Sequence, residues 1–136
     1  MWDERISLVR AFADAITERD VEAALELCHA EIEFFSLMAQ LEASPYRGFA
    51  GIRRYFRDID ATWEEWRVDV ERLLSAQDGR VMIVMSTHMR GKGSGLPFVQ
   101  RVANLWEFKD EKLWRATLYR DPGEALRATE VPPLEH

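Results

Sequence analysis

Asn104 is a polar residue within a strongly apolar stretch, Phe98–Phe108, and is the first candidate for chemistry. In a strand it shares one side with Val102 and Trp106, because side chains alternate across a strand. A buried amide either bonds to neighbouring backbone or water, or it contacts a ligand and can donate a hydrogen bond to a carbonyl. The sequence leaves both roles open.

His88 is a candidate acid–base residue within the predicted strand Val81–Arg90. An unperturbed imidazole has a pKa near ~6.5 and exchanges protons around neutral pH. On its strand His88 shares a side with Ser86 and Arg90, and the sequence does not fix whether that side faces the interior. A structural role therefore stays open beside a catalytic one.

Metal and phosphate chemistry have little support in the sequence. His29 follows a predicted helix end, where a capping or packing role is simplest, and no acidic residue stands at ligand spacing beside it or beside His88. Lys92 and Ser94 alternate with glycines in Gly91–Gly95, but a phosphate loop is followed by a helix, and here a strand follows. We predict a hairpin connection there, and neither a metal nor a cofactor.

Size and composition predict a single globular domain. The chain has 136 residues, of which 47% are hydrophobic and 31% charged, which is enough to bury a core. We assign residues 1–131 to this domain and residues 132–136 to a tail whose last three residues resemble an expression-tag scar. The one cysteine, Cys28, excludes an internal disulfide.

Charge and hydropathy limit the classes of binding partner and the cellular compartment that we expect. The formal net charge of −6 and the lack of a basic run argue against nucleic acid and anionic membranes as partners. No apolar run approaches the ~20 residues of a membrane span, and the N-terminus lacks a signal-peptide pattern. These features predict a cytoplasmic protein.

Apolar spacing predicts three helices in the first half of the chain. The first covers Asp3–Thr17, the second begins after the N-cap residue Asp20 and ends near Cys28, and the third begins at Phe49. The apolar stripes of the first and third helices contain Val9, Phe12, Ala13, Ile16, Ile52, Tyr55, Phe56 and Ile59. Such stripes face a core.

The remaining segments predict strands. We expect them over Glu31–Leu37, Trp66–Glu71, Val81–Arg90, Phe98–Phe108 and Lys112–Arg120. Asp78-Gly79 predicts a tight hairpin turn, and Met38–Gly48 a loop that forms part of a cavity rim. Helices followed by four long antiparallel strands predict an α+β fold, in which a curved sheet wraps a helix into a cone with an open mouth.

Several short motifs support one family. They are Asp20-Val21-Glu22-Ala23-Ala24, Ile32-Glu33-Phe34, Tyr46-Arg47-Gly48, Gly51-Ile52-Arg53, Arg90-Gly91, Ser94-Gly95, Trp106-Glu107-Phe108, Tyr119-Arg120-Asp121 and Glu124-Ala125-Leu126. Together with the order of elements, they resemble the SnoaL-like branch of the nuclear-transport-factor-2-like superfamily, over roughly Ile6–Ala128. This resemblance implies a cone-like sheet packed on three helices. Members include polyketide cyclases, ketosteroid isomerase, epoxide hydrolases and non-catalytic binders, so the fold does not select an activity.

This sequence lacks the catalytic residues that two enzymes of that superfamily use. Ketosteroid isomerase needs a carboxylate base and two acidic donors, and the resemblance places Ser36 at the base, with Phe12 and Asn104 at the donors. Phe12 cannot donate and Ser36 has no carboxylate, so steroid-type isomerisation is not expected. The Asp–Arg–Asp set of limonene-type epoxide hydrolases also lacks its acidic members around Arg101 and Leu118.

The resemblance suggests further residues of a cavity. It places Tyr119 near the pocket, where its hydroxyl is a donor candidate, whereas Tyr55 on the inner helix stripe favours core packing. The predicted pocket wall consists of Phe12, Phe34, Ser36, Tyr55, Phe56, Val102 and Trp106.

Two functions stay open. The first is a cyclase- or isomerase-type enzyme acting on a small hydrophobic, carbonyl-bearing molecule, with Asn104 polarising the substrate and His88 or Tyr119 moving a proton. The second is a non-catalytic ligand-binding or dimerisation domain, which the missing carboxylates favour. We also expect a homodimer through the outer sheet face around Val99, Ala103 and Leu105, because a two-fold contact can pair such a surface with itself.

Overall fold

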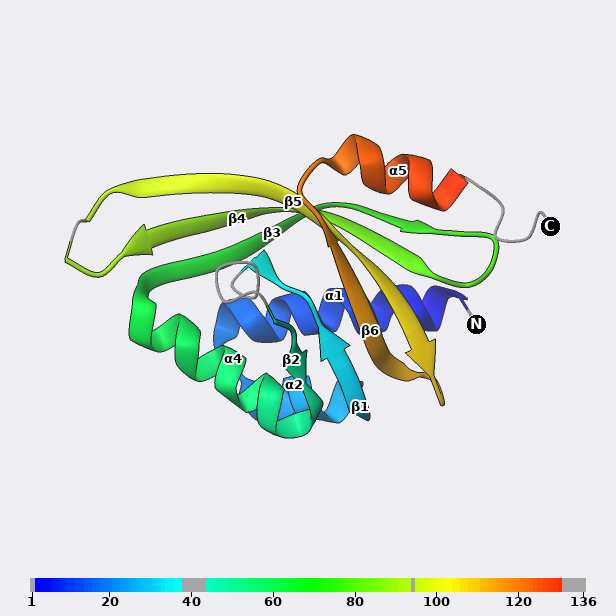
Figure 1. Cartoon of the computed structure of the whole chain (residues 1–136), viewed down its shortest axis with the longest axis horizontal. Helices are drawn as coiled ribbons and strands as arrows, with labels where there is room; N and C mark the ends of the chain where they lie inside the picture. Colours follow the sequence, from blue (N-terminus) through cyan, green and yellow to red (C-terminus); the bar gives the residue numbers. More distant parts are fainter. Residues whose placement is uncertain (1, 38–43, 94, 131–136) are drawn as a thin grey trace.

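The computed structural model describes residues 2–37, 44–93 and 95–130 (Figure 1). The helices are α1 (Trp2–Glu18), α2 (Val21–Leu27), α4 (Gly48–Thr62) and α5 (Pro122–Glu130). The strands are β1 (Cys28–Phe34), β2 (Tyr46–Arg47), β3 (Trp63–Ser75), β4 (Val81–Gly91), β5 (Pro97–Lys109) and β6 (Lys112–Tyr119). They form one sheet in the order β2-β1-β6-β5-β4-β3, which confirms the α+β class.

The sheet is curved but not closed, and α1 lies across its concave face (Figure 1). Register shifts accompany the curvature, because a bulge bends its strand; the extra residue lies in β3 between Val70 and Arg72 and in β6 between Leu113 and Arg115. The apolar stripe of α1 packs onto the strands, with Val9, Phe12 and Ile16 buried. The short helix α5 covers part of the opposite face (Figure 1).

Local signals explain how the helices begin and end. The Asp20 carboxylate accepts a hydrogen bond from the Ala23 amide at 3.1 Å and caps α2, as the sequence predicts. The buried residues of α4 are Gly51, Ile52, Tyr55, Phe56 and Ile59, of which the last four belong to the predicted stripe; Trp63, also predicted there, instead begins β3. The Asp78-Gly79 turn joins β3 to β4, and Gly79 has φ +90°, a conformation that suits glycine.

The first strands differ from the sequence prediction. β1 begins at Cys28, three residues early, and pairs in parallel with β6, whereas an antiparallel sheet was expected. The predicted loop Met38–Gly48 contains the short strand β2, and its residues 38–43 lie outside the described part of the chain. A strand of two residues has no periodicity, so it emerges only from its pairing with β1.

Gly51 lets the first turns of α4 approach β2. A Cβ atom added there would lie 2.8 Å from the carbonyl carbon of Tyr46, which is backbone and cannot turn aside. We therefore predict that Gly51→Ala lowers the free energy of unfolding by about 1–3 kcal/mol, although alanine favours helices. Urea unfolding of the two proteins measures the difference.

Gly123→Ala in α5 is the matched control for that substitution. There an added Cβ would meet only the side chains of Asp121 and Arg127, at 3.3 and 3.6 Å, and these can move. Equal losses of stability at the two positions would contradict a close approach that is specific to Gly51.

Candidate functional site

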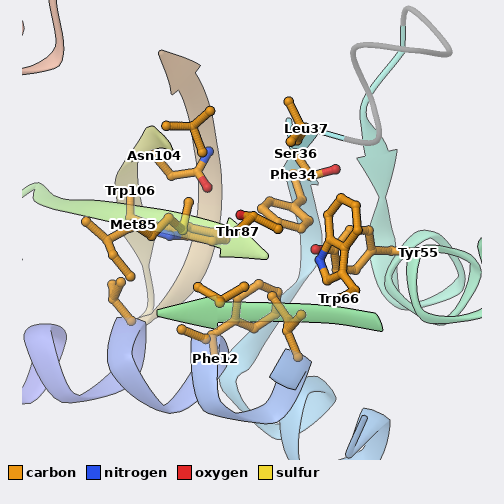
Figure 2. Close-up of a pocket in the computed structure, with 16 residues that line it drawn as sticks. Phe12, Phe34, Ser36, Leu37, Tyr55, Trp66, Met85, Thr87, Asn104 and Trp106 are labelled. Carbon is orange, nitrogen blue, oxygen red and sulfur yellow. The ribbon is translucent and has the colours of Figure 1, made fainter. Parts of the chain in front are cut away.

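A small pocket lies between the concave face of the sheet and the helices α1 and α4 (Figure 2). Its cavity measures about 30 Å³, while one water molecule needs roughly 10–15 Å³ on such a measure. The lining residues are Val9, Phe12, Ala13, Ile16, Phe34, Ser36, Leu37, Tyr55, Trp66, Val68, Ile83, Met85, Thr87, Val102, Asn104 and Trp106. A pocket of this volume accommodates a small group, and a larger molecule enters only if side chains repack.

Aromatic rings form one wall of the pocket. The Phe34 ring meets Phe12 edge-on with centroids 5.3 Å apart, and Tyr55 edge-on at 5.0 Å. It also stacks on Trp106 at 5.5 Å. These separations are the ones that aromatic pairs prefer, so the wall is preorganised rather than loosely filled.

Asn104 is anchored by the backbone. Its amide nitrogen donates to the carbonyl oxygens of Phe35, at 3.0 Å, and Thr117, at 3.2 Å. The side chain thereby ties β5 to β6 and to the residue that follows β1, and its two N–H groups are already used. Figure 2 shows its oxygen on the side of the pocket, where Asn104 can act as an acceptor.

Trp66 presents a buried donor to the same pocket. The residue is only 4% exposed, and its indole Nε1 makes no hydrogen bond to any described residue. A buried donor without a partner costs about 1–3 kcal/mol. A native structure tolerates such a group where water or a ligand supplies the acceptor.

Tyr55 lies next to the Trp66 indole (Figure 2). Burial raises the pKa of the Tyr55 hydroxyl well above its ordinary value, and the Trp66 indole and the charge of Arg19 oppose that shift only in part. The indole N–H is therefore close enough to the hydroxyl to affect its pKa, but the two groups do not have the geometry of a hydrogen bond. Tyr55 therefore stays protonated at neutral pH.

Further polar groups are few in the lining. Ser36 and Thr87 are both buried, with 2% and 3% of their surface exposed. None of the described lining residues is Asp, Glu, His, Lys or Arg, so Tyr55 is the one titratable side chain among them. The described lining residues thus offer hydrogen-bond donors and acceptors, and none of them is a carboxylate, imidazole or amine that could act as a general base.

Most residues of the predicted pocket wall do meet in this pocket. Phe12, Phe34, Ser36, Tyr55, Val102 and Trp106 line it together with Asn104. Phe56 does not line this pocket. It follows Tyr55 in α4, so its side chain points in another direction and lines a separate groove beside Arg19 and Val21.

His88 and Tyr119 lie on the outer face of the sheet. His88 Nε2 is 2.9 Å from Asp69 Oδ2, in a partly exposed pair. Tyr119 packs in the small apolar cluster under α5, with Leu105 and Ala125. The strand alternation that brings Thr87 and Asn104 inward turns both of these side chains outward, so neither reaches a molecule in the pocket.

Sequence reasoning missed Trp66, Met85 and Thr87 as pocket residues. Their alternation with polar neighbours identified strands but not which side faces α1. Once one inward residue of β5 is known, the register settles the others, because Val102 pairs with Met85 and Met85 with Val70. Pairing between strands, rather than any motif, carries this information.

The outer face is partly covered by the chain itself. Ala103 and Leu105, which we expected at a dimer contact, are 0% and 3% exposed beneath α5. Val99, at the other end of the strand, is 53% exposed. The expected dimer surface is therefore limited to the part of the sheet that α5 leaves uncovered.

The described residues 2–37, 44–93 and 95–130 lack the features that a metal site of three ligands, a reactive thiol or a membrane-spanning helix requires. They contain no group of three His, Cys, Asp or Glu side chains placed to bind a metal. Burial raises the pKa of the Cys28 thiol to about 12, which removes it as a nucleophile at neutral pH. None of their helices combines the length and the apolar character needed to cross a membrane.

Solved structures with the same fold cover nearly the whole chain. A nuclear-transport-factor-2-like protein from Burkholderia thailandensis is 22% identical, covers 93% of this chain and 98% of its own, and gives a TM-score of 0.74. A Catenulispora acidiphila protein with a ketosteroid isomerase-like fold, in complex with trimethylamine, is 22% identical with 92% and 93% coverage and a TM-score of 0.73. TerC, co-crystallised with polyporic acid, is 18% identical with 94% and 99% coverage and a TM-score of 0.74. At these identities the likeness shows a shared fold.

Among curated protein sequences, none matches this chain significantly. The profile of the SnoaL-like domain matches residues 9–116, which include α1 from Val9 onward, the sheet up to Ala116 and the residues that line the pocket. The open curved sheet, the helix across its concave face and this match agree, and the chain belongs to the SnoaL-like family.

Proposed function

We propose that this protein binds a small, mainly apolar organic molecule whose oxygen accepts a hydrogen bond from Trp66. The unpaired indole N–H, buried in a pocket walled by aromatic rings, is the observation that carries the proposal. A carbonyl oxygen there would remove the cost of the unpaired donor, and the rings would contact the apolar remainder of the molecule. The Asn104 oxygen would accept from a hydroxyl or N–H of the same ligand.

Binding is better supported than acid–base catalysis. A base that removes a proton from carbon needs a carboxylate, imidazole or amine near the substrate, and none of the described lining residues supplies one. Tyr55 remains a neutral donor, because burial raises its pKa. Two similar structures hold small organic molecules, trimethylamine and polyporic acid, which supports a binding use of this fold.

A cyclase- or isomerase-type activity is the second candidate. Tyr55 and Trp66 are neighbouring donors and would both point at one substrate oxygen, where charge could develop during a reaction. Such a site would polarise a carbonyl, and the proton transfers would use solvent or the substrate itself. Turnover that disappears in Tyr55→Phe, while binding is retained, would select this candidate.

The first prediction concerns the indole N–H of Trp66. Cyclohexanone should shift its ¹H–¹⁵N NMR signal in a saturable manner, because the ketone oxygen accepts its hydrogen bond. Methylenecyclohexane, which has nearly the same shape but no acceptor, should leave that signal almost unmoved. Trp66→Phe identifies the signal among the five tryptophans by removing it.

The same variant supplies the control for stability. Trp66→Phe keeps an aromatic ring and removes the unpaired donor, so the free energy of unfolding should change by less than about 1.5 kcal/mol. The preference for the ketone over the hydrocarbon should vanish in this variant. Equal shifts by both molecules in the wild type would contradict the proposed recognition.

The second prediction concerns Tyr55 and high pH. Unfolded tyrosine titrates near pH ~10, whereas burial raises the pKa in the folded protein, so above that pH the unfolded state loses its proton first. The contribution of Tyr55 to the free energy of unfolding is therefore complete below pH ~10 and is lost as the pH rises toward the pKa of Tyr55 in the folded protein. Relative to Tyr55→Phe, the wild type should lose roughly 1.4 kcal/mol of unfolding free energy per pH unit in that range. Urea unfolding at pH 8 to 11 measures this, and parallel curves would show that Tyr55 is not buried.

A further inference from the structure

A second concave site lies outside the aromatic pocket and shares no residue with it. This groove has a volume of about 210 Å³ and is lined by Arg19, Val21, Arg53, Phe56, Arg57 and Asp60. It lies where α1 ends and α2 begins, against α4. Three of its six lining residues are arginines, although the whole chain has a net charge of −6.

Arg19 is held rigidly at one side of the groove. Its backbone has φ +57°, and its Nη1 donates to the carbonyl oxygens of Ile16, at 2.6 Å, and Trp66, at 2.9 Å. Its Nε donates to Asp60 Oδ1 at 3.1 Å. Of the five N–H groups of the guanidinium, the two on Nη2 make no hydrogen bond to the described residues. These donors are fixed in place before any ligand arrives.

Arg53 and Arg57 lie one turn apart on α4. Like charges at this spacing destabilise a helix by about 0.2–0.5 kcal/mol. Arg53 contacts Glu22 at 3.2 Å, but the Glu22 side chain is 72% exposed, so that pair is weak. Arg57 forms no ion pair with the residues that the structure describes. An anion between the two guanidiniums would remove their repulsion.

We infer that this groove binds the oxyanion group, a phosphate or a carboxylate, of a small molecule. Guanidinium groups match both anions with paired, charge-assisted hydrogen bonds. The Phe56 and Val21 side chains provide an apolar floor beside the three cations. Asp60 is the one acid in the lining and lowers the affinity for anions, so removing its charge should strengthen binding. The inference is independent of the function proposed for the aromatic pocket.

The test is an NMR titration of the full chain with inorganic phosphate and, separately, with acetate, at constant ionic strength. Both the backbone amide and the Nε–H signals of Arg19, Arg53 and Arg57 should shift and saturate. Arg57→Gln should weaken binding about tenfold, because it removes charge-assisted hydrogen bonds. Arg57 is exposed, so this variant should fold normally. Asp60→Asn should strengthen binding.

Arg10→Gln is the matched control, since Arg10 is an exposed arginine of α1 outside the groove and its loss changes the net charge equally. It should leave the dissociation constants within about twofold. Tighter binding of phosphate would identify a phosphate ligand, and tighter binding of acetate a carboxylate; both outcomes support the inference. Shifts that do not saturate, or equal weakening by Arg57→Gln and Arg10→Gln, would overturn it.

Discussion

The packing of Phe34 against three other rings holds the two halves of this protein together. Its ring contacts Phe12 of α1, Tyr55 of α4 and Trp106 of β5, so residues far apart in sequence meet at one point. Each such pair adds about 0.5–1.5 kcal/mol beyond the area that it buries. Because β1 carries this ring inward at its last position, the parallel pairing of β1 with β6 sets where the helices lie against the sheet.

The same packing gives the pocket its chemical character. The rings fill most of the concave space and leave a cavity of about 30 Å³, next to the side chains of Asn104 and Trp66. Asn104 uses both N–H groups to fix the backbone, whereas the Trp66 N–H makes no hydrogen bond of good geometry to the described residues. Among the described residues, the lining is thus mainly apolar and includes one buried donor without a hydrogen bond, but no carboxylate, imidazole or amine.

Much of the fold could be predicted from the sequence, because it rests on local patterns. The stripe of α4, the Asp20 cap and the Asp78-Gly79 turn are each encoded within a few residues. The parallel pairing of β1 and the strand β2 depend on partners distant in the chain, and no short pattern contains them. The SnoaL-like resemblance supplied the overall arrangement, and the profile match confirms it.

The candidate site was only partly predictable, for a related reason. Apolar residues such as Phe12 and Trp106 are conspicuous in any inward stripe, but His88 and Trp66 could be placed only after the faces of their strands were known. One residue of offset separates the inner from the outer face of a strand. His88 therefore turned out to face Asp69 outside, and Trp66 to face the pocket.

The most direct test of the proposed recognition is a high-resolution crystal structure of the protein soaked with cyclohexanone. We expect side chains of the lining to repack around the ketone, which then lies among the rings of Phe12, Phe34 and Trp106 with its oxygen about 2.7–3.2 Å from Trp66 Nε1. A pocket that stays empty at saturating ketone, or a ketone whose oxygen points away from Trp66, would contradict this account.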